Sequence, residues 1–244
     1  DSFKQMGIVI TSTCTPYLAG NLPRFREHIA WSESSAVSFS NSVIGARTNR
    51  EGGPSALAAS ICGRTPKYGL HLWKNRQPTI KVHVDAKLSF TSDYGALGYL
   101  VGKKVKNKIP FFTGIKEANT DHLKSLGAAM AASGAVALYH IENLTPESDL
   151  VDTDVTETIT VEQKDIDETY ETLSQGSKPD IVILGCPHAS LREIATLAEK
   201  VTGKQLKKPV WICTSRMMKE AADRMGFSQT INDAGGHVVA DTCM

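Results

Sequence analysis

Two arginines in a short polar loop are the residues of this sequence best suited to chemistry. Arg47 and Arg50 stand in the run GARTNREGG, just before a helix that should begin at Pro54. A guanidinium group donates two parallel hydrogen bonds to a carboxylate or phosphate, and the N-terminus of a helix attracts anions. With Asn49 between them, these arginines predict an anion-binding loop. The alternative is a flexible surface loop with two solvated arginines.

A predicted helix before this loop carries polar groups on its apolar side. The apolar residues that share one arc of this helix are Ile29, Ala30, Ala36, Val37, Val43 and Ile44. Glu33 and Ser40 fall in the middle of that arc, where an unpaired carboxylate is unfavourable, so they need a buried network or a ligand. We take Glu33 and its neighbour Ser34 as candidate catalytic residues and Ser35 as a candidate substrate contact. The helix is expected to stop at Gly45.

Three cysteines follow three predicted strands. Cys14, Cys186 and Cys243 come shortly after strands expected over residues 6–10, 180–184 and 237–240. Ligands collect at the carboxyl ends of parallel strands, and thiolates are the usual ligands of iron–sulfur clusters. Three of them would leave one iron open to act as a Lewis acid toward a hydroxyl group. The alternative is a set of buried thiols without a shared ligand, which the lack of a CxxC spacing favours.

Other residues near these strand ends could assist. His188 could hydrogen-bond the substrate or a cluster sulfur, although a histidine at a strand end is more often a structural group. Ser215 and Arg216 follow another predicted strand and could give a second anion contact. Cys213 is expected in the core, and Cys62, late in an alanine-rich helix, is expected to be structural.

The order of the predicted elements indicates an α/β protein. After residue 180 the sequence reads strand, helix, strand, helix, strand with short links, which is typical of a parallel doubly wound sheet. Ser190 and Glu193 form a capping box at the start of the first of these helices. Earlier in the chain we expect a half-exposed strand at 80–84, a closely packed helix from 93, a helix from 120 or 121 to 134, a strand at 135–141 and, within the acidic segment 147–171, a connection with a helix.

The composition describes an ordinary globular chain. It has 244 residues, 41% of them hydrophobic and 22% charged, with a formal net charge of +1. So small a charge argues against general electrostatic binding to nucleic acid or anionic membranes. No apolar run approaches the roughly 18 residues of a spanning helix. Five widely spaced cysteines do not resemble a secreted disulfide framework, so we expect a cytoplasmic protein.

Several strings of this sequence resemble one enzyme family. The strings are AWSESSAV, NSVIGARTNREGGPSALAA, GRTPKYGLH, TCTPYLAGNLP, SDYGALGYLVG, LKSLGAAMAASGAVALYH, ILGCPHAS and ADTCM, and they span nearly the whole chain. As a set they are specific, and they resemble the large subunit or catalytic part of aconitase X. Arg26 departs from the family, which is expected to carry glycine before Glu27 and His28. Family large subunits also extend beyond both ends of this sequence, so we expect an internal piece of a longer subunit.

The resemblance implies a fold, a cofactor and a partner. The fold would be aconitase-like α/β, with parallel doubly wound sheets and helices on both faces. We expect one α/β region over residues 1–150 and a second, with βαβαβ order, over residues 151–244. The resemblance further implies an iron–sulfur cluster, expected as 4Fe–4S, held by Cys14, Cys186 and Cys243. It also implies a small swivelling subunit that brings the catalytic base.

The same resemblance implies a hydro-lyase that dehydrates a small 3-hydroxy carboxylic acid. Members of the family act on mevalonate 5-phosphate or on cis-3-hydroxy-L-proline. The lysine-rich segment 103–112 and the lack of a fused small domain favour mevalonate 5-phosphate, which would become an anhydromevalonate phosphate. The alternatives are dehydration of cis-3-hydroxy-L-proline and a cluster-binding or anion-binding regulatory module without turnover.

Overall fold

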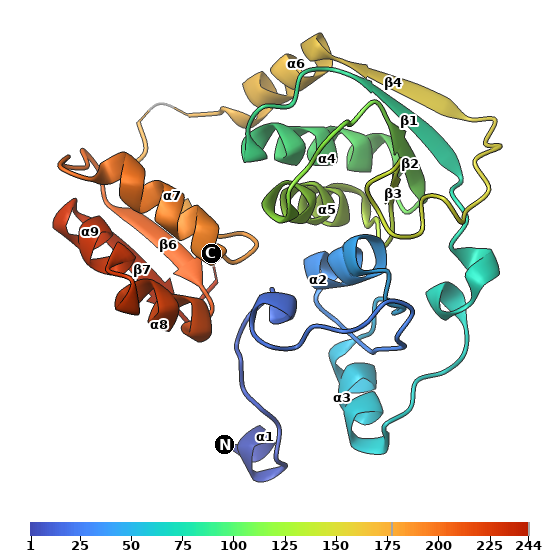
Figure 1. Cartoon of the computed structure of the whole chain (residues 1–244), viewed down its shortest axis with the longest axis horizontal. Coiled ribbons are helices and arrows are strands. Elements are labelled where there is room, and N and C mark those ends of the chain that lie inside the picture. The colour runs from blue at the N-terminus through green and yellow to red at the C-terminus, as the bar shows by residue number, and fades with distance from the viewer. Residues whose placement is uncertain (177, 244) are drawn as a thin grey trace. The chain divides into compact units, whose positions relative to one another are not determined.

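The computed structural model describes residues 1–176 and 178–243 of the chain. One compact unit consists of residues 1–22 and the described residues from 176 onward, and the other consists of residues 23–175 (Figure 1). None of the described helices is long and apolar enough to cross a membrane. The expected boundary at residue 150 stays a prediction, because compact units within one chain need not be independent domains.

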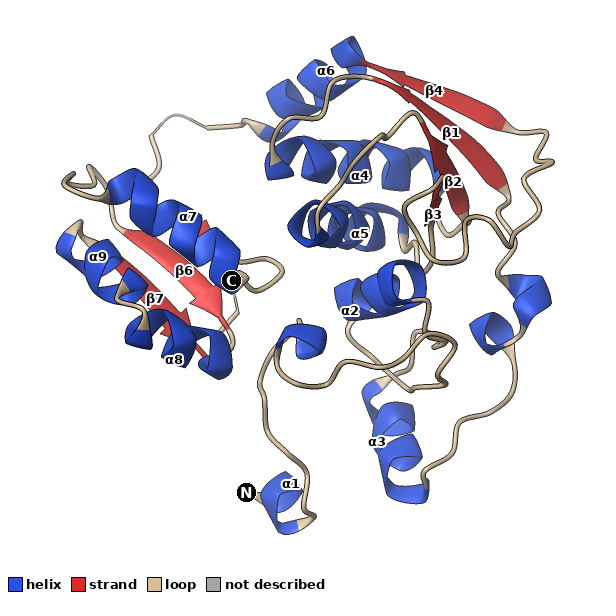
Figure 2. Cartoon of the chain, viewed as in Figure 1, coloured by secondary structure: helices blue, strands red, loops and turns tan. Residues whose placement is uncertain are grey.

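A four-stranded parallel sheet organises the unit of residues 23–175. Its strands are β1 (Ile80–Asp85), β2 (Pro110–Thr113), β3 (His140–Ile141) and β4 (Thr158–Glu162). They lie in the order β3-β2-β1-β4, so the chain moves from β1 to one edge and then returns to the other side of β1 (Figure 2). This reversal is the strand order of a doubly wound sheet.

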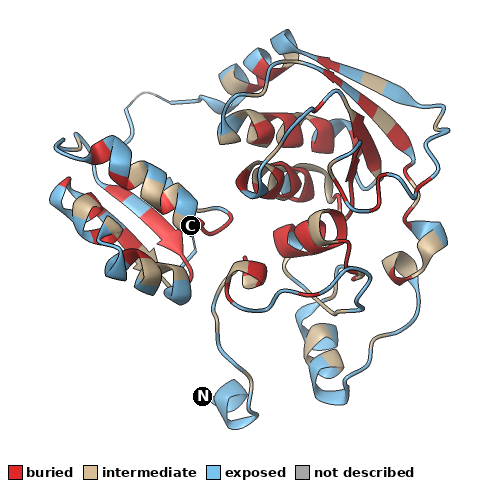
Figure 3. Cartoon of the chain, viewed as in Figure 1, coloured by how far each residue is buried: buried red, intermediate tan, exposed pale blue. Residues whose placement is uncertain are grey.

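Three helices pack on one face of this sheet. They are α4 (Thr91–Val105), α5 (Thr120–Gly134) and α6 (Gln163–Leu173). In β1, Ile80, Val82 and Val84 are buried and join an apolar core with side chains of these helices, whereas His83 and Asp85 are exposed. The alternation therefore gives the strand one face in the core, as predicted. Figure 3 shows the buried residues concentrated in the sheet, α4, α5 and α2.

The sequence located some of these elements better than others. The strand at 80–84 and the helices beginning near 93 and 120 are confirmed, although α4 is longer than expected and Asn119 caps α5. Of the strand expected at 135–141, only the last two residues pair with a neighbour. The strand β4 was missed because it lies in the acidic segment, where its alternating pattern TITVE is short.

The helices α4 and α5 approach closely because glycines line their contact. A Cβ atom at Gly98 would lie 2.4 Å from the carbonyl oxygen of Leu126, and one at Gly102 would lie 3.0 Å from the Cα atom of Met130. Glycine at these positions lets the two backbones meet, so the predicted close packing is confirmed.

The segment before β1 supplies the polar loop and its supports. It contains α2 (Ser34–Phe39), the π-helical turn η2 (Ser40–Ile44), α3 (Gly53–Cys62), and the 3₁₀ turns η3 (Gly69–His71) and η4 (Trp73–Asn75). Gly45 ends the helical stretch with φ +73°, as expected. The predicted helical start at residue 29 is wrong, because residues 28 and 47 form a parallel bridge and the helix begins only at Ser34.

The other unit contains a three-stranded parallel sheet, whose strands alternate in the chain with longer helices than those near residue 1. The strands β5 (Val182–Leu184), β6 (Val210–Thr214) and β7 (Gly236–Ala240) lie in sequence order. The helices are α7 (Leu191–Val201), α8 (Arg216–Arg224) and α9 (Phe227–Asp233). The capping box at α7 is confirmed, with the Glu193 carboxylate accepting from the Ser190 amide at 2.8 Å. The strand β5 is exposed rather than buried.

The strand predicted at residues 6–10 is wrong. This segment is irregular and follows the short helix α1 (Ser2–Gln5), and Val9 is 83% exposed. An apolar run becomes a strand only when another strand supplies backbone hydrogen bonds, and no described strand pairs with it. Cys14 therefore lies in a loop before the 3₁₀ turn η1 (Pro16–Leu18) and not at a strand end. The fold class itself, α/β with parallel sheets, is as expected.

We predict that Gly98→Ala lowers the free energy of unfolding by about 1–3 kcal/mol, because the new methyl group would collide with the backbone of α5. Gly95→Ala in the same helix is the matched control. Its methyl group would meet only the Ser125 hydroxyl, which can rotate away, and alanine favours the helix by about 1 kcal/mol. Urea denaturation measures both variants. Equal stability of the two would contradict the close backbone contact.

Candidate functional site

The side chain of Arg47 is half-buried and only partly bonded. Its Nη1 donates to the carbonyl oxygen of His71 at 3.4 Å, and its guanidinium lies 6.0 Å from the centre of the Trp73 ring. Its Nε is buried and has no hydrogen-bond partner among the described residues. Arg50, by contrast, is exposed. Arg47 therefore keeps donor capacity for a ligand, and its backbone is fixed by bonds to residues 27 and 29.

Asn49 supports the chain and does not have its side chain free for a ligand. Its Oδ1 accepts from the Leu70 amide at 2.8 Å, and its Nδ2 donates to the Tyr68 carbonyl oxygen at 3.2 Å. The segment reaches this position because Gly69 adopts φ +57°, and a Cβ atom there would lie 2.1 Å from the Asn49 oxygen. Asn49 thus holds residues 68–70 against the arginine loop.

A glutamate occupies the helix start that was expected to attract an anion. The Glu51 Oε2 accepts from the Ser55 hydroxyl at 2.7 Å, and its Oε1 is buried without a hydrogen-bond partner among the described residues. The carboxylate supplies negative charge beside the N-terminus of α3, where an anionic ligand would compete with it.

The candidate residues Glu33, Ser34 and Ser35 lie at the N-terminus of α2, where Glu33 is the cap. The Glu33 carboxylate accepts from the Ala36 amide at 2.6 Å, the Ser35 amide at 3.1 Å and the Ser35 hydroxyl at 2.7 Å. Glu33 is therefore the cap and does not sit mid-helix on the apolar side, which corrects the expected geometry. Carboxylates are favourable at this end of a helix because of its exposed N–H groups.

A pair of histidines borders Arg47 and was missed in the sequence. The Nδ1 atoms of His28 and His71 lie 2.8 Å apart, and their rings stack with centroids 5.1 Å apart. Burial lowers the pKa of both, followed by the charges of Arg47 and neighbouring cations for His28, and by the partner ring for His71. Neutral rings allow one Nδ1 to donate and the other to accept. No short-range signal links residues 43 positions apart in the chain.

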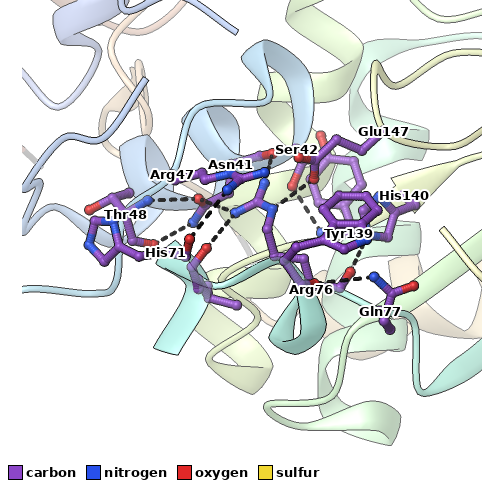
Figure 4. Close-up of polar contacts among 12 residues, drawn as sticks. Asn41, Ser42, Arg47, Thr48, His71, Arg76, Gln77, Tyr139, His140 and Glu147 are labelled. Atoms are coloured by element: carbon purple, nitrogen blue, oxygen red, sulfur yellow. Dashed lines mark hydrogen bonds and ion pairs between the residues drawn. The ribbon is translucent and has the colours of Figure 1, made fainter. Parts of the chain in front are cut away.

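A buried ion pair joins Arg76 and Glu147, as Figure 4 shows. The Arg76 Nε donates to the Glu147 Oε2 at 2.8 Å, and the two side chains are 0% and 2% exposed. Burial raises the pKa of Glu147, while the positive charges of Arg76, Arg47 and Arg26 oppose that rise. The sequence offered no sign of this pair, because Arg76 stands in a polar segment typical of an exposed loop.

Three cysteines of the unit of residues 1–22 and 176–243 lie at or after the carboxyl ends of β5, β6 and β7. Cys186 and Cys243 are exposed and follow β5 and β7. Burial raises the pKa of the Cys213 thiol, and the thiols of Cys243 and Cys186 raise it further. The Cys14 sulfur accepts from the His188 amide at 3.2 Å. Cys213 is in the core, as predicted.

The structure brings these thiols to one region but does not assemble a metal site. Among residues 1–176 and 178–243, no three His, Cys, Asp or Glu side chains are placed to hold a metal ion. Cys62 is exposed at the end of α3, in the unit of residues 23–175, and so lies in a different unit from the other cysteines.

Both ring nitrogens of His188 have protein partners. The Nε2 lies 2.8 Å from the Thr242 carbonyl oxygen and must donate, so the Nδ1, 2.8 Å from the Thr13 hydroxyl, accepts in the neutral ring. The buried imidazole thus joins the loop of Cys14 to the segment of Cys243. His188 therefore fixes the residues next to Cys14 and next to Cys243 in the chain.

The candidate anion contacts after β6 are also engaged. The buried Ser215 caps α8 by accepting from the Met218 amide at 3.2 Å. Arg216 is exposed and forms an ion pair with Asp241, with its Nε 3.0 Å from the carboxylate. A ligand would have to displace or share these contacts.

Three family models together match almost the whole chain. They are the aconitase X first domain over residues 1–74, the second domain over residues 78–171 and the third domain over residues 179–244. The chain belongs to the aconitase X family. The first and third domain models together contain the arginine loop and all five cysteines.

Relatives within the aconitase X family carry two kinds of name. A protein of Methanocaldococcus jannaschii named phosphomevalonate dehydratase large subunit is 54% identical over the whole chain. A protein of the same name from Thermococcus kodakarensis is 52% identical over 99% of the chain. The cis-3-hydroxy-L-proline dehydratase of Pseudomonas aeruginosa is 34% identical over 99% of it.

A solved aconitase X structure has the same fold. The holo-form from Thermococcus kodakaraensis superposes with a TM-score of 0.95 at 51% identity, over 99% of this chain and 64% of that one. The fold class is thereby confirmed. The chain spans 63% of each of the two phosphomevalonate dehydratase relatives and 44% of the Pseudomonas protein.

The buried His140 predicts a pH dependence of stability. Its Nε2 donates to the Arg76 carbonyl oxygen at 2.9 Å, and its Nδ1 is buried without a hydrogen-bond partner among the described residues. Burial lowers the pKa of His140 to about 4. The pKa of His140 is lower in the folded state than in the unfolded state, so the neutral ring stabilises the fold fully above about pH 6.5. As the pH falls toward 4, the free energy of unfolding decreases by about 3 kcal/mol.

We therefore predict that His140→Asn makes unfolding less dependent on pH in this window. Urea denaturation at several pH values between about 7 and 4.5 should give a shallower decline for the variant than for the native chain. Parallel declines for the two proteins would contradict a buried neutral imidazole at this position.

Proposed function

We propose that this chain is part of the large subunit of a hydro-lyase that dehydrates mevalonate 5-phosphate. The single observation that carries the proposal is identity above 50% along the chain to proteins named phosphomevalonate dehydratase large subunit. The arginine loop adds a chemical reason, since it offers guanidinium donors to the carboxylate or phosphate of such a substrate. The product would be an anhydromevalonate phosphate.

The anion subsite is proposed at Arg47 and Arg50. Arg47 has an unused buried N–H and a backbone fixed on both sides, so it can bind an anion without first becoming ordered. Arg50 is exposed and adds a second positive charge two residues after Thr48. Asn49 and Ser35 are proposed to shape the subsite, since their side chains hold neighbouring backbone and Glu33.

We further propose that Cys14, Cys186 and Cys243 hold an iron–sulfur cluster, expected as 4Fe–4S. The chemistry of the donors supports this proposal, because thiolates are the usual ligands of such clusters and His188 bonds both to Cys14 and to Thr242, the neighbour of Cys243. The His188 amide donates to the Cys14 sulfur, and hydrogen bonds to ligand sulfurs tune the reduction potential of such clusters. When bound, the cluster would supply a Lewis-acid site for the substrate hydroxyl group.

The catalytic base is proposed to come from a small subunit. In this chain the Glu33 carboxylate accepts from four donors, and both His188 ring nitrogens have partners. We therefore assign orienting roles to Glu33, Ser34 and His188, and secondary anion contacts to Ser215 and Arg216. The name large subunit in the relatives supports a smaller partner, and a cytoplasmic location belongs to the same proposal.

The deciding experiment assays the full-length subunit alone and with its candidate small subunit after anaerobic cluster reconstitution. Turnover of mevalonate 5-phosphate by the pair, but not by either subunit alone, is the expected result. Turnover of cis-3-hydroxy-L-proline instead would refute the proposed substrate and identify the protein as a cis-3-hydroxy-L-proline dehydratase. Cluster incorporation without turnover of either substrate would identify a regulatory module and refute the enzyme.

We predict that replacing Cys14, Cys186 or Cys243 singly with serine abolishes stable iron binding and the visible absorbance of the reconstituted protein. Serine removes the soft sulfur ligand while preserving size. Cys62→Ser, at an exposed position on α3, is the matched control and should retain full iron content. Retention of iron by one of the three variants would remove that cysteine from the ligand set.

We also predict that Arg47→Lys and Arg50→Lys each lower kcat/KM by about 10- to 150-fold, which corresponds to roughly 1.5–3 kcal/mol for a charge-assisted contact. Lysine keeps the charge but loses the planar fork. The exposed Arg64 gives a control, because Arg64→Lys should leave the kinetics unchanged. Native kinetics in both loop variants would exclude the anion subsite, and unfolding free energies should stay near the native value throughout.

A further inference from the structure

The buried pair Arg76–Glu147 has no part in the proposed chemistry, yet the Arg76 guanidinium bonds to two residues that contact the arginine loop, Asn41 and Leu70. Besides its bond to Glu147, the guanidinium donates from Nη1 to the Asn41 Oδ1 and to the Leu70 carbonyl oxygen, both at 3.1 Å. Its Nη2 donates to the Asn41 carbonyl oxygen at 2.9 Å. One rigid fork therefore ties together three separate segments of the chain.

Asn41 transmits this arrangement to the loop. Its Oδ1 accepts from the Thr48 amide at 3.0 Å, and its Nδ2 donates to the Thr48 carbonyl oxygen at 2.9 Å and to the Ala137 carbonyl oxygen at 3.0 Å. With Arg76 as the second donor to Oδ1, the side-chain amide uses its full hydrogen-bonding capacity. Asn41 and Thr48 are both fully buried, so water cannot replace these bonds.

Thr48 connects the hydrogen bonds of Arg76 and Asn41 to the candidate site. It stands between Arg47 and Asn49, and a single side-chain amide fixes both its N–H and its carbonyl group. Figure 4 shows Asn41 between Arg76 and Thr48, with Arg47 beside them. The direction of the Arg47 side chain depends on this backbone.

Arg76 also bonds to the turn η3, which packs against the loop. The Leu70 carbonyl oxygen that it binds belongs to the residue whose amide donates to the Asn49 Oδ1. The next residue, His71, provides the carbonyl oxygen for the Arg47 Nη1. Arg76 therefore fixes both the loop and the turn against which the Arg47 side chain lies.

We propose that Arg76 is a positioning residue, held in place by Glu147, which acts through Asn41 and Leu70 to orient Arg47 for binding the anionic group of the substrate. The inference rests on the proposed anion-binding role of Arg47. A preset loop needs little ordering when the ligand arrives, so its loss should weaken binding more than it slows the chemical step.

The test compares Arg76→Lys with a core variant of the same unit in the full-length subunit paired with its small subunit. Lysine keeps the charge for Glu147 but cannot contact Asn41 and Leu70 together. Ile166→Ala removes a buried side chain of α6 that packs in the apolar core of the sheet and its helices. We expect Arg76→Lys to raise KM about tenfold with kcat within about threefold of native, and Ile166→Ala to lower stability without moving KM.

Two further readouts do not depend on turnover. Hydrogen exchange at the Thr48 amide should accelerate in Arg76→Lys and in Asn41→Ala, and should remain native in Ile166→Ala under conditions where all are folded. Binding of inorganic phosphate, measured by calorimetry, should weaken about tenfold in Arg76→Lys. Glu147→Gln keeps an acceptor for the Arg76 Nε and should give smaller changes in both.

The outcomes separate the inference from the proposed function. A native complex that turns over neither substrate refutes the proposed function, whereas Thr48 exchange and phosphate affinity still decide the role of Arg76. If Arg76→Lys changes KM, phosphate affinity and Thr48 exchange no more than Ile166→Ala does, Arg76 is only a core residue and the inference is overturned.

Discussion

A positive charge without access to water governs the unit of residues 23–175. Arg76 is fully buried, and a buried guanidinium is unfavourable unless its N–H groups are bonded and its charge is balanced. The required acceptors come from Asn41, from the 3₁₀ turn at residue 70 and from Glu147 after β3. Only a chain folded so that these three segments converge satisfies the charge. The same requirement fixes the polar loop, whose backbone is bonded to one of these acceptors.

Local signals predicted much of the architecture, and long-range ones were needed for the rest. The alternation at residues 80–84 and the capping box at Ser190 are complete within a few residues, so the sequence alone located them. The apolar run at residues 6–10 failed because a strand depends on a neighbour that supplies hydrogen bonds. The helix expected from residue 29 failed for a related reason. Its first residues bond to the loop at 47 instead, and Glu33 sets the true start.

In the candidate site, too, local features could be predicted from the sequence and contacts between distant segments could not. The types and spacing of Arg47 and Arg50 indicated an anion loop, and where Arg47 lies is compatible with that interpretation. The supports of the loop were not predictable, since Asn41, His71 and Glu147 come from segments with no shared pattern. The partners of Glu33 and His188 could not be read from the sequence either. The roles expected of these two residues stay predictions.

The hydrogen bond between Thr13 and His188 has a consequence for how the chain acquires its structure. It joins residues 175 positions apart, and Cys14 and the His188 amide are separated almost as widely. Closing so long a loop is entropically unfavourable, and contacts of high sequence separation slow folding. During synthesis residues 13 and 14 leave the ribosome long before residue 188 is made, whereas residues 23–175 form a continuous unit that can fold first. The loop of Cys14 therefore gains its contacts with His188 only after the whole of residues 23–175 has been synthesised.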